Sequence, residues 1–157
     1  MASRARRYLV AGILILGSFV SALSDVSTNV AHAQNRYRED PKLRKSRARD
    51  ALTRAMTLNA QVELMLHQGS GDINRMVQML GQSYGYQVTS IAQMEGIVRE
   101  ASFKDPIVER GILDMYERGK PATMVAQTQI KNGDYGAALE SLATAKDSHR
   151  RFMALLY

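Results

Sequence analysis

Small and apolar residues spaced three and four positions apart constrain the end of this chain more than any other feature. Between residues 135 and 157 they form a single stripe made up of Ala138, Leu142, Ala145, His149, Phe152 and Leu156. Such spacing places side chains on one face of a helix. Pro121 is predicted to start the preceding helix, because proline suits the first helical position. Asn132-Gly133 supplies a turn and Asp134 a cap for the next helix, so residues 121–157 are predicted to form a helical hairpin.

The turn and the second helix of this hairpin resemble one tetratricopeptide (TPR) repeat. The resemblance is carried by Gly133-Asp134-Tyr135 and by the residues that follow, Ala138, Leu139, Leu142 and Ala145, with Ala126 in the preceding helix. Three positions depart from the family pattern, namely Ala122, Gln129 and Arg150. The resemblance implies stacked helical hairpins that bind other proteins. The alternative is an independent hairpin that uses the same generic turn chemistry.

Helical signals continue through the middle of the chain. Asp40-Pro41 and Asp105-Pro106 each combine a capping residue with a proline at the first helical position, and Asp72 is a third cap. We expect helices from 41 to about 67, from 73 to about 101 and from 107 to about 119. The first carries the stripe Ala48, Ala51, Leu52, Ala55, Met56, Asn59, Val62 and Leu66. No sustained alternating run indicates strands, so the predicted fold is all-α: a small helical bundle or a TPR-like array of about five helices.

Residues 1–33 have the pattern of a signal peptide. Three arginines precede a charge-free apolar run from 8 to 23, and Ala31-His32-Ala33 matches an Ala-x-Ala cleavage signal. Cleavage before Gln34 would leave a basic arm, 34–40, and a single helical domain, 41–157. Cleavage after Ala22 and an uncleaved anchor are the alternatives. The pattern predicts an exported protein, periplasmic or associated with the cell envelope of a bacterium.

The chain contains no cysteine. Disulfides, thiolate metal sites and covalently attached c-type haem are therefore excluded. Cleavage before Gln34 would leave 157 minus 33, or 124, residues, which suffices for one domain with a modest core. We expect that domain to be stabilised by packing alone.

Positive charge is concentrated near the start of the predicted domain. Residues 36–54 contain eight basic and three acidic side chains. Export argues against nucleic acid, so the candidates are an anionic envelope surface or an acidic protein. The residues predicted to make such a contact are Lys42, Arg44, Lys45, Arg47 and Arg49. A solvated helix face is the alternative.

No catalytic or phosphate-binding motif is present, so we expect neither an enzyme nor a cofactor. Two sets of soft ligands keep an alternative open. Met65, His67, Met76 and Met79 flank one predicted turn, and cuprous ion prefers thioether and imidazole ligands. Methionine is also a common filler of apolar cores.

The second set consists of Met56 in the first predicted helix and His149 in the last. The two residues resemble the axial ligand pair of the cytochrome b562 family, small helical bundles of the periplasm. This resemblance implies a b-type haem held between helices by one methionine and one histidine. A half-buried structural role for His149 is the other interpretation.

The chain ends with several apolar residues. Phe152, Leu155, Leu156 and Tyr157 are predicted either to contact a protein partner or a second copy of the chain, or to fold back into a closed bundle. The leading hypothesis is an envelope protein-interaction module, an adaptor or accessory subunit. The alternative function is a periplasmic copper- or haem-binding helical bundle.

Overall fold

A computed structural model describes residues 40–69, 71–100 and 105–157. Within these ranges the chain forms helices joined by short turns, with no strand, as predicted. The predicted signal peptide, 1–33, lies outside the described residues, as does the predicted basic arm except for Asp40. No helix in the described ranges combines the length and the apolar character that crossing a membrane requires.

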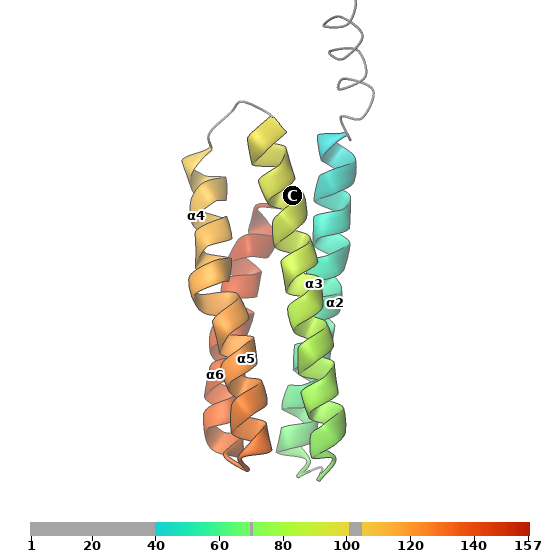
Figure 1. The fold of residues 1–157 in the computed structure, drawn as a ribbon, viewed down its shortest axis with the longest axis vertical. Coiled ribbons are helices and arrows are strands. Elements are labelled where there is room, and N and C mark those ends of the chain that lie inside the picture. The colour runs from blue at the N-terminus through green and yellow to red at the C-terminus, as the bar shows by residue number, and fades with distance from the viewer. Residues whose placement is uncertain (1–39, 70, 101–104) are drawn as a thin grey trace, which may run out of the picture. The chain divides into compact units, whose positions relative to one another are not determined.

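The described residues form a bundle of four long helical rods in which each rod runs antiparallel to the one before it (Figure 1). The first two are α2 (Pro41–His67) and α3 (Ile73–Glu100). The third is continuous through α4 (Pro106–Asp114), the π-helical turn η1 (Met115–Gly119) and α5 (Lys120–Lys131). The fourth is α6 (Tyr135–Ala154). The prediction of an all-α bundle is confirmed, whereas the TPR-like hairpin stays a prediction.

Aspartate side chains start the rods where the sequence predicted them. Asp40 and Asp105 each accept a hydrogen bond of 2.9 Å from the backbone N–H two residues later. Asp72 and Asp134 accept bonds of 3.0 and 3.2 Å from the N–H three residues later. Each cap satisfies a backbone donor that has no partner inside the helix. The turn before α6 depends on Gly133, whose φ of 77° favours glycine.

Pro121 lies in the first turn of α5, as predicted, but no new rod starts there. Gly119, the residue before α5, has helical φ and ψ of −61° and −56°, and the helix runs through the proline without a side-chain cap. Proline inside a regular helix lacks one hydrogen-bond donor, and its ring collides with the preceding turn. Here the Lys120 N–H donates to the Met115 carbonyl, five residues back. This wider π turn relieves the crowding just before the proline.

The apolar core is divided into two clusters at different levels of the bundle. One cluster contains Leu52 from α2 and Phe152 from α6, together with Ala48, Ile91, Met94, Ile112, Met115 and Leu156. The other contains Val62 from α2 and Leu142 from α6, together with Met76, Met79, Leu80, Ala126, Ile130 and Ala138. Both clusters join the first rod to the last, so the bundle is closed.

Buried polar side chains lie between the two clusters. Gln87 on α3 donates from Nε2 to the Thr123 hydroxyl on α5 at 2.9 Å. The Ser83 hydroxyl donates to the Ala55 carbonyl on α2 at 3.0 Å. On α6, the Ser148 hydroxyl donates to the Asp114 carboxylate at 2.7 Å. These residues, with Asn59 and His149, form what we call the polar layer.

A substitution of Gly119 tests how closely η1 approaches α6. A Cβ at this position would lie 2.9 Å from both the Ser148 Oγ and the Met115 Sδ. Gly119→Ala is therefore expected to lower the free energy of unfolding, by about 1–3 kcal/mol, because it overpacks the layer. Urea denaturation measures this change.

Gly85→Ala is the matched control, because a Cβ there meets nothing within 4 Å. In the interior of α3 it should raise stability by about 0.5–1 kcal/mol through helix propensity alone. Equal stability of the two variants would contradict the close packing of η1 against α6.

Candidate functional site

A cavity of about 370 Å³ lies between α2 and α6. This volume falls within the roughly 300–1,000 Å³ that is typical of small-ligand sites. Its walls come from both helices: Thr53, Met56, Thr57, Asn59, Ala60 and Glu63 on α2, and Leu142, Lys146, His149, Arg150 and Met153 on α6. The cavity is thus built from the first and last rods of the bundle.

Helical spacing brings these residues to one place. On α6, the positions Leu142, Lys146, His149 and Met153 follow steps of four, three and four, which is one face of a helix. On α2, Met56, Asn59 and Glu63 do the same. The two stripes face each other because the two apolar clusters, one on each side of the cavity, hold α2 against α6. Small side chains such as Ala60 leave room between them.

His149 is the most unusual residue of the cavity. Its side chain is 0% exposed, and neither ring nitrogen has a hydrogen-bond partner within the described residues. The side-chain amide of Asn59, which is 5% exposed, has no partner there either. An unsatisfied buried polar group costs about 1–3 kcal/mol, and native folds contain few. Two such groups line this one cavity, which makes it the candidate site.

Burial sets the charge state of His149. Removal from water lowers the pKa of its imidazole from 6.5 to about 4, because the charged form loses its hydration. The ring is therefore neutral near pH 7. A neutral imidazole has a free nitrogen lone pair, which can accept a hydrogen bond or bind a metal.

Charged side chains lie at the rim of the cavity. Lys146 on α6 forms an ion pair of 3.1 Å with Glu63 on α2. Both side chains are partly exposed, so the pair contributes at most about 1 kcal/mol. Arg150 adds a second positive charge. Lys146 pairs with the only carboxylate of the lining, so Arg150 leaves an excess of one positive charge around the cavity.

Met56 and His149, the pair that resembles the cytochrome b562 ligands, line this same cavity. Met153 lies one turn beyond His149 on α6 and lines it too. Sequence reasoning missed Met153 and Asn59 as site residues. The spacing of four residues between His149 and Met153 could have indicated the former. The missing partner of Asn59 becomes visible only when the bundle is assembled.

Of the other predicted soft ligands, the three methionines come together and the histidine does not. Met76 and Met79 both belong to the second apolar cluster, and Met65 packs against it. Met65 and Met79 also line a hollow beside Arg75, whereas His67 is exposed at the end of α2. Among the described residues, no group of three or more histidine, aspartate or glutamate side chains is placed to hold a metal ion.

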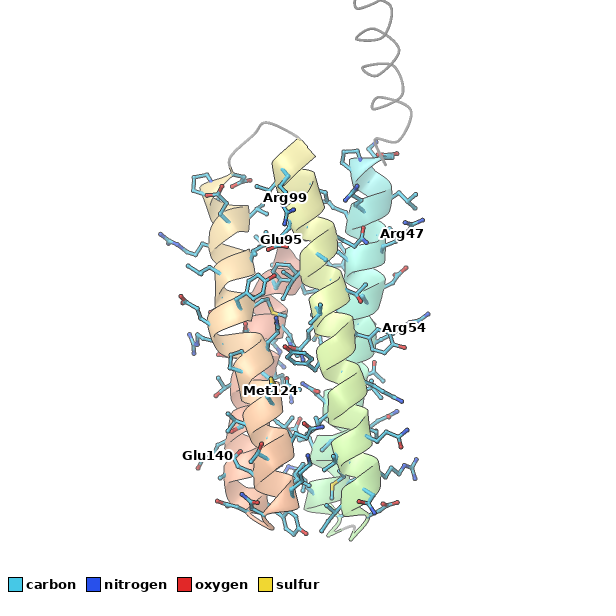
Figure 2. The ribbon with its side chains drawn as sticks, in the orientation of Figure 1. Arg47, Arg54, Glu95, Arg99, Met124 and Glu140 are labelled. Atoms are coloured by element: carbon cyan, nitrogen blue, oxygen red, sulfur yellow. The ribbon has the colours of Figure 1, made fainter. Side chains whose placement is uncertain are left out.

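The basic residues near the start of α2 do not form a uniform exposed patch. The Arg44 guanidinium packs over Gly96, where a Cβ would have no room. Arg49 lies over the Tyr157 ring, 5.3 Å from its centroid, and Lys45 is half-buried. Lys42 is exposed, as is Arg47, which lies on the outer side of α2 together with Arg54 (Figure 2). Contact with an anionic surface stays a prediction for the exposed members.

The four C-terminal residues predicted to meet a partner have different environments. Phe152 and Leu156 are buried in the first apolar cluster, and Leu155 packs against it. Tyr157 is 83% exposed. Phe152 and Leu156 therefore close the bundle and offer no docking surface in this fold. Of the four, only Tyr157 is open to a partner, and it is already in contact with Arg49.

Comparisons with models of protein families, with curated proteins and with solved structures each gave no match. The likeness to TPR repeats and to cytochrome b562 thus stays a resemblance of a few residues. The chemistry of the cavity is inferred from its own side chains.

Replacing the His149 imidazole tests whether this side chain contributes to the stability of the fold. His149→Leu keeps a similar volume and removes the unsatisfied polar group, so we expect the free energy of unfolding at pH 7 to rise by about 1 kcal/mol. Ser148→Ala is the neighbouring control and should lose about 1 kcal/mol, because it leaves the Asp114 carboxylate without its 2.7 Å partner. A drop in stability with His149→Leu would show that the imidazole is structural.

The pH dependence of stability tests the state of His149. In the unfolded chain the imidazole binds a proton below pH 6.5, but in the fold only below about pH 4. Stability should therefore fall as pH drops from 6.5 towards 4, by up to about 3 kcal/mol from this group, and level off below. Urea denaturation between pH 4 and 7 measures it. His149→Leu should lack this component, and identical profiles would contradict a buried neutral imidazole.

Proposed function

We propose that this protein is an exported binding protein of the cell envelope whose ligand is a metal centre held in the α2–α6 cavity by imidazole and thioether groups. The observation that supports it is the fully buried His149, which has no hydrogen-bond partner within the described residues and lines the cavity with Met56 and Met153. Neutral imidazole and thioether are the donor types that haem iron and cuprous ion accept.

Ligand binding is supported better than the protein-interaction role expected from the sequence. That role was inferred from the apolar C-terminal residues, from the basic residues near the start of the domain and from the TPR-like turn. Packing in the core accounts for two of the C-terminal residues, Phe152 and Leu156. No comparable account exists for His149 and Asn59, whose polar atoms have no protein partner in the described ranges. A ligand explains both residues together.

A b-type haem would use two of the donor groups of the cavity. His149 from α6 and Met56 from α2 would hold its iron, and both side chains reach one cavity. Such a haem would supply one-electron redox chemistry. The chain's own contribution would be to keep the imidazole neutral through burial.

The proposal is tested on the protein purified gently from its own cell envelope. Native mass spectrometry, absorbance and elemental analysis of the same sample should show a bound metal centre in the unsubstituted protein. His149→Leu should lose the bound mass while remaining folded, and Ser148→Ala should retain it. A metal-free protein of bare polypeptide mass would contradict the proposal, as would equal metal content in the two variants.

A further inference from the structure

Three soft donors share the α2–α6 cavity, and they come from two rods. His149 and Met153 lie one turn apart on α6, and Met56 lies on α2, the facing helix. An axial pair for haem requires only two of these side chains. A set of two thioethers and one imidazole is instead suited to a single soft ion, because thioether ligands select Cu(I) and imidazole binds copper well.

The size of the gap between the rods also favours a bare ion. Leu52 and Phe152 bring α2 and α6 together on one side of the cavity, and Val62 and Leu142 do so on the other. The Glu63–Lys146 ion pair adds a third link between the two helices. A single ion needs no separation of the rods beyond the existing cavity of about 370 Å³.

The charges around the cavity favour a monovalent ion. Lys146 and Arg150 contribute two positive charges and Glu63 one negative charge. The repulsion from this excess positive charge doubles for a divalent ion relative to a monovalent one. The lining has no free carboxylate to offset that repulsion or to satisfy a hard cation, and the chain has no thiolate. Monovalent copper suits both the charge and the donors.

From these observations we propose that Met56, His149 and Met153 form a binding site for one cuprous ion. The inference rests on the proposed function and names its ligand. The buried imidazole supplies the nitrogen ligand and the two methionines supply sulfur ligands from opposite helices. Because the site joins the first and last rods, bound Cu(I) also stabilises the closed bundle.

The test is a Cu(I) titration of the processed protein under ascorbate, in competition with the chelator bathocuproine disulfonate. We expect one Cu(I) per chain. Met56→Leu and Met153→Leu conserve volume, and each should weaken Cu(I) binding by about tenfold or more, since loss of even an outer partner of a metal ligand costs roughly 10–100-fold. The matched controls, Met65→Leu and His67→Gln, lie outside the cavity and should bind as the unsubstituted protein does.

Absence of Cu(I) binding would overturn the site, as would equal affinities for the cavity variants and the controls. A parallel titration with haemin separates this inference from the proposed function. A haem absorbance band that His149→Leu abolishes, without Cu(I) binding, would overturn the copper site and leave the metal-centre proposal standing. If the protein binds neither probe, both fail.

Discussion

The polar layer between the two apolar clusters is the constraint on which the rest of this bundle depends. Buried polar groups are tolerated only when they find partners. Part of the layer meets this condition through bonds between rods: Ser83 donates to the Ala55 carbonyl and Gln87 Nε2 to Thr123, although Gln87 Oε1 has no partner among the described residues. On the side of α2 and α6 the condition is not met by the described residues, since Asn59 and His149 have no partner there. The cavity lies at this unsatisfied side.

The third rod is shaped by the same layer. Ser148 bonds to Asp114 and lies against Gly119, so α6 approaches the third rod closely where that rod contains the π turn. The turn also lets the rod continue through Pro121. Irregular π turns inside helices are often found near functional sites, and here the irregular turn contacts the face of Ser148, next to His149 on α6. The contact with the π turn, at Ser148, and the histidine without a partner, His149, are therefore neighbours in the polar layer.

The sequence predicted the local structure well where the signal was local. The aspartate caps depend on residues two or three positions away, and all four formed as expected. The stripe from Ala138 to Leu156 is buried along its length, because helical spacing alone fixes which face is apolar. Pro121 lies at the start of α5 as expected, but the continuity of the third rod through it was not foreseen, because the π turn that precedes it has no sequence signature of its own.

The candidate site could be predicted only in part. Met56 and His149 were paired through a resemblance, and the fold places both at one cavity. Met65, His67, Met76 and Met79 were grouped because they are close in sequence; the fold packs the three methionines in or against the second apolar cluster and leaves His67 exposed. That Asn59 lacks a partner is a property of packing between rods distant in sequence. Such a property becomes visible only when the whole bundle is in hand.

A crystal structure of the protein purified from its native cells would test the central claim most directly, namely that His149 contacts a ligand. We predict density for a bound centre in the α2–α6 cavity, within bonding distance of an imidazole nitrogen and of the Met56 sulfur. If both ring nitrogens are instead hydrogen-bonded to protein groups in a cavity without a ligand, the buried histidine is structural and the claim is wrong.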